Sequence, residues 1–286
     1  MLRGFYTAAS GMLAQQRRTE LLTNNMSNAN TTGYKADQMS VRSFPEMLIS
    51  SMGGETVPTE SKLGMSSFSQ VGGLSTGVYV QEANPLFTQG TLEETQLDTD
   101  ISLVDENLPI NEETGRQGSV FFTVQDGDGA IRYTRNGSFT LDGQGYLTTP
   151  SGHYVLNENN EKIQLDSDRF TVAENGVILE GNVQIARLGI CYSDDPSLQL
   201  MKDGEGLYKA VNDGDLPSAY GAADVGFSTK QGFLEGSNVD QSRTMTEMMS
   251  AYRSFEASQK VLQAYDKSLD KPDDDDGDEY AEPTSK

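Results

Sequence analysis

The first thirty or so residues carry an apolar and polar pattern that is typical of an amphipathic helix. Along one face, residues recur at alternating spacings of three and four, as at the a and d positions of a coiled coil. This face consists of Leu2, Phe5, Ala9, Met12, Gln16, Thr19, Thr23 and Met26. We expect the helix to stop at Gly33, because glycine adopts the left-handed conformation without a side-chain clash.

The same spacing predicts a second long helix towards the C-terminus. Its face consists of Met245, Met248, Tyr252, Phe255, Gln259, Leu262, Asp266 and Leu269. Asn238 or Asp240 is expected to cap its start, and Pro272 to end it. A helix that buries only every third or fourth residue needs a partner to be stable. That partner is either the other terminal helix or the helices of neighbouring copies.

Between these helices, from about Val120 to Tyr192, short runs rich in Val, Ile, Phe and Tyr alternate with Asp-Gly, Asn-Gly and similar turn sequences. This alternation predicts an antiparallel sheet. The predicted fold class is therefore α+β, a mainly antiparallel β domain framed by long amphipathic helices. We expect a terminal helix with an asparagine-rich stretch (1–48), a flexible linker (49–66) and an extended arm (67–98). These precede a β domain (99–228), a C-terminal element with its helix (229–271) and a disordered acidic tail (272–286).

The charge balance excludes several classes of partner. The chain has 21 basic and 43 acidic residues, a net charge of −22, whereas a nucleic-acid-binding surface needs basic residues. An anionic membrane surface is disfavoured for the same reason. No apolar run approaches the length of a membrane span, so direct membrane insertion is not expected. The N-terminal segment lacks the continuous apolar region of a cleaved secretory signal.

The residues that usually carry catalysis or bind metals are scarce. The single histidine, His153, follows a turn and is interpreted as a polar residue entering a strand, and Cys191 as a small buried residue. A calcium loop read from Asp126 would need an oxygen ligand at its fifth position and an acid at its twelfth, where Ala130 and Gly137 stand. The sequence DGDG is therefore interpreted as a hairpin turn. We expect no enzymatic activity, no metal and no cofactor.

Three stretches of the sequence resemble the bacterial flagellar rod and hook proteins, the axial proteins of the hook–basal body. NNMSNANTTGYK supplies the family pattern NN-x-x-N-x-N-T-x-G-[FY]-K through Asn24, Asn25, Asn28, Asn30, Thr31, Gly33, Tyr34 and Lys35. GFLEGSNVD resembles the G-x-LE-x-SNV element through Gly232, Leu234, Glu235, Ser237, Asn238 and Val239. FTQGTLEETQLD and YTRNGSFTLDGQGYL resemble the shared β domain. The layout is most similar to that of the distal rod, although residues 99–119 depart from the family pattern.

The resemblance implies a non-enzymatic structural subunit of the basal-body rod that self-assembles helically and transmits motor torque. Its terminal helices would form a coiled-coil inner layer, with the β domain outside. Implied partners are other copies, other rod and hook proteins, and the flagellar type III export apparatus, which would deliver the chain to the basal body without a cleaved signal. FPEML, with Phe44 and Leu48 four apart, resembles the export-gate recognition element, although a helix face or a linker anchor has the same spacing.

Two sets of residues are predicted to contact neighbouring subunits, the helix faces and the asparagines. The asparagine amides either join stacked subunits, since each donates and accepts, or cap a helix end and turn locally. The predicted interface comprises Leu2, Phe5, Ala9, Met12, Asn24, Asn25, Met26, Asn28, Asn30, Asn238, Met245, Met248, Tyr252, Phe255, Leu262 and Leu269. Two alternatives remain, a hook or hook-like protein, and a secreted β-domain binding module with helical oligomerisation ends.

Overall fold

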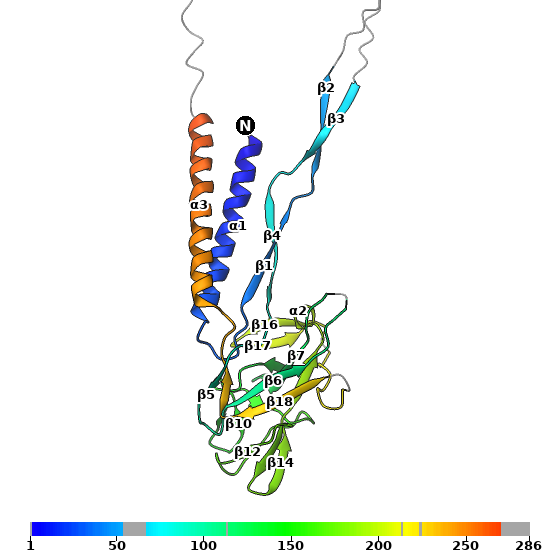
Figure 1. The fold of residues 1–286 in the computed structure, drawn as a ribbon, viewed down its shortest axis with the longest axis vertical. Coiled ribbons are helices and arrows are strands. Elements are labelled where there is room, and N and C mark those ends of the chain that lie inside the picture. Colours follow the sequence, from blue (N-terminus) through cyan, green and yellow to red (C-terminus); the bar gives the residue numbers. More distant parts are fainter. Residues whose placement is uncertain (1, 54–66, 113, 213, 223–224, 270–286) are drawn as a thin grey trace, which may run out of the picture. The chain divides into compact units, whose positions relative to one another are not determined.

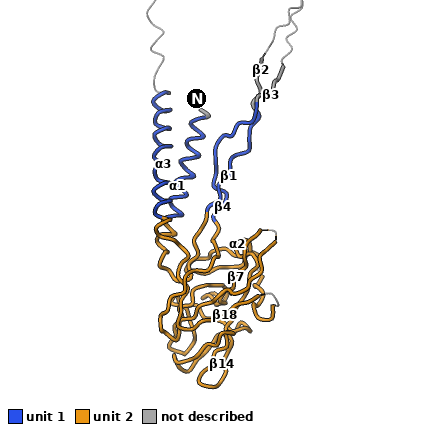
Figure 2. The backbone as a smooth tube through the Cα atoms, in the orientation of Figure 1, with its two compact units in different colours: residues 1–22, 39–83, 245–286 blue, residues 23–38, 84–244 orange. Residues whose placement is uncertain are grey.

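The computed structural model describes residues 2–53, 67–112, 114–212, 214–222 and 225–269 (Figure 1). The chain divides into two compact units, each built from segments far apart in sequence (Figure 2). The first comprises Met1–Leu22, Met39–Ala83 and Met245–Lys286, and the second Thr23–Gln38 and Asn84–Thr244. The predicted tail and most of the predicted linker lie outside the described residues.

Two long antiparallel helices lie side by side in the first unit, α1 (Leu2–Ser27) and α3 (Gln241–Leu269) (Figure 1). Gly4 lies so close to Tyr265 that a Cβ on the glycine would overlap the tyrosine hydroxyl. Arg18 forms an ion pair with Glu247 at 3.4 Å. The described part of the chain contains no helix with the length and hydropathy of a membrane span.

On α3, the face that meets α1 is shifted by one residue from one line of the predicted a/d face. Ala251, Ser258 and Tyr265, seven residues apart, face α1 or are buried there, whereas the prediction placed Tyr252 and its heptad equivalents on that line. Gly4 leaves room for the Tyr265 ring, and the small side chain of Ala251 is buried. Met245 and Tyr252 are each left 55% exposed. The coiled-coil layer between copies stays a prediction.

The first unit also contains paired strands, which lie in the predicted N-terminal segment, the linker and the arm. Strand β1 (Asp37–Ser43) pairs with β4 (Val78–Pro85). Strand β2 (Met47–Gly53) pairs antiparallel with β3 (Ser67–Leu74). Residues 49–53 of the predicted linker therefore form part of a strand. Ser, Gly and Met do not by themselves prevent pairing when a complementary strand is available.

The second unit is a β domain whose sheets are antiparallel throughout the described residues, which confirms the α+β class. An eight-stranded sheet has the order β16-β17-β8-β7-β11-β10-β9, with β15 also paired to β7. Three further sheets are β12-β13-β14, β18-β6 and β19-β5. The strands are β5 (Leu92–Glu94), β6 (Ile101–Asn107), β7 (Ser119–Gln125), β8 (Ile131–Thr134), β9 (Thr140–Leu141), β10 (Leu147–Thr148), β11 (Tyr154–Val155), β12 (Thr171–Val172), β13 (Val177–Glu180), β14 (Val183–Arg187), β15 (Ile190–Ser193), β16 (Leu200–Gly204), β17 (Leu207–Ala210), β18 (Gly226–Gln231) and β19 (Phe233–Glu235).

Strand β7 is the centre of this domain. Its side chains are buried from Ser119 to Val124, because it pairs with β8, β11 and β15 and has core residues on both faces. Phe122 packs edge-on against Phe139 at 5.1 Å between ring centroids. Phe121 packs on the opposite face with Phe87 and Tyr208. A short helix, α2 (Pro196–Gln199), precedes β16.

The turn predictions succeed with one instructive exception. Asp126 donates its N–H to the Ala130 carbonyl at 2.9 Å, and Gly129 has a φ of 83°, so DGDG is a hairpin turn between β7 and β8. The predicted Asn-Gly hairpin at Gly137 is wrong, because Gly137 does not have a positive φ. It is instead buried against the Ile101 carbonyl, which a Cβ would overlap.

We expect Gly137→Ala to lower the free energy of unfolding by about 1–3 kcal/mol, since an added methyl must displace close-packed backbone. Gly143→Ala is the matched control, because Gly143 is exposed in a turn and a Cβ there would meet no heavy atom within 4 Å. Urea denaturation of both variants measures the difference. Equal stability of the two variants would contradict the packing argument.

Candidate functional site

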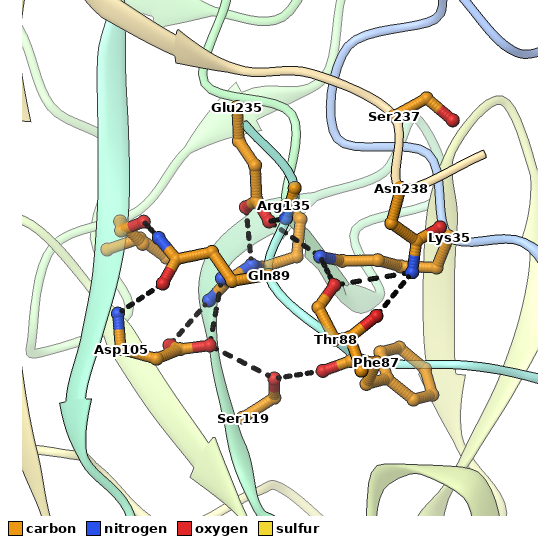
Figure 3. Close-up of polar contacts among 12 residues, drawn as sticks. Lys35, Phe87, Thr88, Gln89, Asp105, Ser119, Arg135, Glu235, Ser237 and Asn238 are labelled. Atoms are coloured by element: carbon orange, nitrogen blue, oxygen red, sulfur yellow. Dashed lines mark hydrogen bonds and ion pairs between the residues drawn. The ribbon is translucent and has the colours of Figure 1, made fainter. Parts of the chain in front are cut away.

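Three segments from distant parts of the chain meet in the second unit. They are residues 33–38, residues 86–94 and residues 232–238, which belong to the asparagine-rich stretch, the predicted arm and the C-terminal element. Figure 3 shows the side chains that join them. We call this cluster the motif junction and define it as Lys35, Asp105, Arg135, Glu235 and Asn238.

The Glu235 carboxylate lies at the centre of the motif junction. Its Oε1 accepts hydrogen bonds from Lys35 Nζ at 2.6 Å and from the Gly90 N–H at 2.9 Å. Its Oε2 accepts from Arg135 Nε at 2.8 Å. The side chains of Lys35 and Arg135 are fully buried, and that of Glu235 is 1% exposed. One carboxylate therefore neutralises a cation from the N-terminal motif and a cation from the β domain.

Arg135 also binds a second carboxylate. Its Nη1 and Nη2 donate to the two oxygens of Asp105 at 2.9 and 3.0 Å, a bidentate pair, and Nη1 donates to the Val120 carbonyl at 2.7 Å. Ser119 donates to Asp105 at 3.4 Å. Planar guanidinium groups suit such two-point contacts. The motif junction thus contains two cations and two anions, so its buried charge is balanced.

Asn238 joins all three segments through its amide. Its Nδ2 donates to Thr88 Oγ1 at 2.9 Å (Figure 3). The same Nδ2 donates to the Leu86 carbonyl at 2.7 Å, and the Oδ1 accepts from the Ala36 N–H at 2.8 Å. Because this amide is already engaged, Asn238 does not cap α3. Asp240 does, by accepting from the Arg243 N–H at 3.0 Å.

Gly33 has a different role from the predicted one. Helix α1 ends at Ser27, so Gly33 does not stop it. Its φ is 67°, its N–H donates to the Glu235 carbonyl at 2.7 Å, and a Cβ would lie 2.6 Å from the Arg135 backbone. Glycine is therefore required because the N-terminal motif approaches the backbone of the β domain directly.

Burial and pairing shift the ionisation of the motif junction in opposite senses. Burial, assisted by Arg135, lowers the pKa of Lys35 to about 8, while Glu235 limits the decrease. At pH 7 the ammonium is therefore charged. Burial alone would raise the pKa of Glu235, but Arg135 and Lys35 outweigh it and hold that pKa below its usual value. The pKa of Arg135 is raised, because Asp105 and Glu235 outweigh its burial.

Lys202, which the sequence interpretation missed, holds the N-terminal motif from β16. Its Nζ donates to the Lys35 carbonyl at 3.0 Å, contacts Asp37 Oδ1 at 2.7 Å and lies 4.4 Å from the centre of the Tyr34 ring. Burial and Asp37 raise the pKa of Tyr34. No periodicity or motif marks Lys202, because its contacts depend on where β16 lies in the fold.

The described contacts support local capping for the asparagines. Asn25 is buried and pairs with the backbone of Asp37, donating to its carbonyl and accepting from its N–H, each at 2.9 Å. The Tyr34 hydroxyl donates to Asn24 Oδ1 at 2.8 Å. Asn28 Nδ2 donates to the Asn24 carbonyl at 2.9 Å, at the end of α1. Contacts of these amides with neighbouring subunits stay a prediction.

The remaining predicted interface residues lie along α1 and α3, apart from Asn30, whose Oδ1 accepts from Gln241 Nε2 at 3.1 Å. Met245 and Tyr252 are exposed, and the side chains of Leu2 and Leu269 lie outside the described ones. Half-buried members are Phe5, Ala9, Met12, Met26, Met248, Phe255 and Leu262. The structure therefore places these residues on the two helices, and their contacts with neighbouring subunits stay a prediction.

The export element belongs to the first unit, and the single histidine belongs to the second. Phe44 packs on Tyr79 at 5.3 Å between ring centroids, and Leu48, in β2, is 72% exposed. The helix-face interpretation of this pair is therefore wrong. His153 immediately precedes β11, and its two ring nitrogens lie 3.1 and 3.0 Å from Asp126 and Glu205.

We expect Arg135→Met to lower the free energy of unfolding by about 3–5 kcal/mol, because Asp105 and Glu235 would lose a buried partner. Arg132→Met is the control, since the nearby pair of Arg132 with Asp203 is partly exposed and should contribute about 1 kcal/mol or less. Urea denaturation followed by tyrosine fluorescence measures both variants. Equal losses would show that burial of the Arg135 network is not stabilising.

Acidification should weaken the motif junction. A carboxylate whose folded pKa lies below its unfolded value contributes stability that is fully present above the unfolded pKa and is lost as the pH falls through the folded one. For Glu235 the unfolded reference is 4.5, so the loss begins below that pH. We expect Glu235→Gln to have a flatter stability profile in this range. Parallel acid profiles for the variant and the wild type would contradict this assignment.

Comparisons with known proteins agree with this geometry. The family model "Flagella basal body rod protein" matches residues 5–35, "Flagellar hook protein FlgE/F/G D1 domain" matches residues 117–187, and "Flagellar basal body rod FlgEFG protein C-terminal" matches residues 230–271. Each matched range contributes one ion of the central contacts, namely Lys35, Arg135 and Glu235. The three matches thus converge on the motif junction.

Full-length relatives carry the same assignment. The flagellar hook-basal body complex protein FlhO of Bacillus subtilis is 46% identical over 271 residues, which cover 95% of this chain and 97% of that protein. The basal-body rod protein FlgG of the same organism is 31% identical, over 94% and 97%. The rod protein FlgF of Caulobacter vibrioides is 29% identical, over 92% and 93%. The chain therefore belongs to the family of flagellar rod and hook proteins of the hook–basal body.

Proposed function

We propose that this chain is a structural subunit of the flagellar basal-body rod, which self-assembles helically through its terminal helices and transmits torque towards the hook. One observation carries the proposal, an uncovered apolar stripe on α3. Met245, Met249 and Tyr252 stand at positions i, i+4 and i+7, and each is about half exposed. We call these three residues the α3 stripe. Large apolar residues aligned on a helix favour burial against another helix.

The motif junction supports the torque-bearing part of the proposal. The last turn of α1, from Thr23, and the first turn of α3, to Thr244, belong to the same compact unit as the β domain. A buried, fully bonded ionic cluster in that unit resists rotation of the helix ends against the sheet. The implied partners are other copies of the chain and other rod and hook proteins.

Delivery by the flagellar type III apparatus forms part of the same proposal. Phe44 is 39% exposed and Leu48 is 72% exposed, so both side chains are accessible to a receptor in the single chain. The packing of Phe44 on Tyr79 equally fits an anchor between strands. Recognition of these residues during export is therefore proposed from the resemblance and from their exposure.

A hook or hook-like subunit is the second candidate. It is favoured by the match of residues 117–187 to a domain model named for the hook protein as well as for rod proteins. Position in the axial structure separates the two candidates. Immunogold labelling of purified hook–basal bodies should place this chain below the hook if it is a rod subunit. Label along the hook would show that the chain is a hook subunit and not a rod subunit. Absence of label from mildly disassembled particles would contradict both assignments.

The α3 stripe provides a test of assembly through the helices. We expect Met245→Gln with Tyr252→Gln to reduce incorporation into hook–basal bodies by roughly tenfold or more, because each buried apolar side chain contributes about 1.5–3 kcal/mol. Met201→Gln is the control, since Met201 is 49% exposed on β16. Quantitative immunoblotting of purified particles measures incorporation, with exported protein as the reference. Normal incorporation of the double variant would contradict assembly through this face.

A further inference from the structure

The two terminal motifs bind each other directly as well as the β domain. The Gly33 N–H donates to the Glu235 carbonyl at 2.7 Å, and Lys35 Nζ donates to the Glu235 side chain at 2.6 Å. The Ala36 N–H donates to Asn238 Oδ1 at 2.8 Å. Each motif therefore completes the binding site of the other.

Residues 86–94 form the shared platform beneath both motifs. Leu86 donates its N–H to the Ala36 carbonyl at 2.8 Å, and the Thr88 carbonyl accepts from Lys35 Nζ at 2.7 Å. On the other side, β5 pairs with β19, and the Gly236 N–H donates to the Thr91 carbonyl at 2.8 Å. Both motifs therefore bind the same segment, residues 86–94.

Charge balance separates the possible states. With both motifs docked, Lys35 and Arg135 face Asp105 and Glu235, and the cluster is neutral. With both motifs released, only Arg135 and Asp105 remain in the cluster, and their bidentate pair is neutral. If the N-terminal motif docks alone, Lys35 has no carboxylate partner and the cluster carries one unpaired positive charge. If the C-terminal element docks alone, Glu235 lacks Lys35 and the cluster carries one unpaired negative charge. Unpaired buried charges are strongly unfavourable, so both half-docked states are disfavoured.

We propose that the motif junction is a two-state latch in which the N-terminal motif and the C-terminal element dock on the β domain together or not at all. The latch goes beyond the proposed function, because it is a property of the single chain. In a rod or hook subunit it would order the ends of both terminal helices in one step. If the two motifs do not dock together in solution, the rod proposal is unaffected. If the chain is not a rod subunit, the latch is equally unaffected.

The test is hydrogen–deuterium exchange of the purified full-length chain, read on peptides from residues 33–38, residues 233–239 and β7. In Lys35→Met we expect exchange to become roughly tenfold or more faster in both motif peptides, including the one that carries no substitution. Glu235→Gln should have the same effect. Exchange in β7 should not change, because Arg135 and Asp105 remain paired.

Matched controls separate the latch from general effects of lost charge. Lys162→Met removes an exposed lysine, and Glu174→Gln removes an exposed carboxylate from the turn between β12 and β13. Neither should accelerate exchange in the motif peptides. The double variant Lys35→Met with Glu235→Gln again has no unpaired charge, so we expect part of the protection to return in both motif peptides relative to the single variants.

Several results would overturn the latch. One is acceleration confined to the motif that carries the substitution, which would mean independent docking. Another is faster exchange of β7 in the single variants, since the released state must keep a folded domain. Additive losses in the double variant would exclude the charge-balance argument. Absence of protection in both wild-type motifs would show that the junction does not form in the single chain.

Discussion

The position of the Glu235 carboxylate constrains much of the second unit. A carboxylate without access to water is stable only when its oxygens are paired, and here the partners are Lys35, Arg135 and the Gly90 N–H. These groups come from three segments that are distant in sequence. For all three groups to reach the carboxylate, β19 must pair with β5. Gly33 must also approach the Arg135 backbone with no side chain between them. A structural subunit obtains from this cluster a fixed connection between its terminal motifs and its sheet.

The helices obey a different constraint, which is the size of the side chains between them. Gly4, Gly11 and Ala251 allow α1 and α3 to approach within the single chain. On α3, Met245, Met249 and Tyr252 remain about half exposed, whereas Phe255 and Leu262 are half-buried. In the proposed rod, a neighbouring subunit would cover the exposed apolar residues of α3.

Periodicity was sufficient to locate both helices and the β domain, because burial on one side imposes a repeat that is visible in the sequence. It did not give the helix–helix contact, since the a/d spacing fits two faces one residue apart and only the close approach at Gly4 and Tyr265 selects between them. The asparagine-rich stretch marked the N-terminal motif, but Lys202, Asp105 and Thr88 carry no local signal. Their roles arise from chain segments that meet only after folding. Gly137 shows the same limit, because an Asn-Gly pair suggests a turn while the Ile101 carbonyl requires the glycine.

The motif junction and the α3 stripe have complementary physical properties. Every ion of the junction has a partner within the chain, so the junction offers no charge for a neighbouring subunit to neutralise. The stripe has apolar surface that the described chain does not cover. Since association gains free energy chiefly from surfaces that are still exposed to water, contacts between subunits are expected at the helices rather than at the junction. In the proposed assembly the asparagines act indirectly. Asn25 and Asn238 use their amides to fix the segments next to the helix ends, and the helices would make the contacts between subunits.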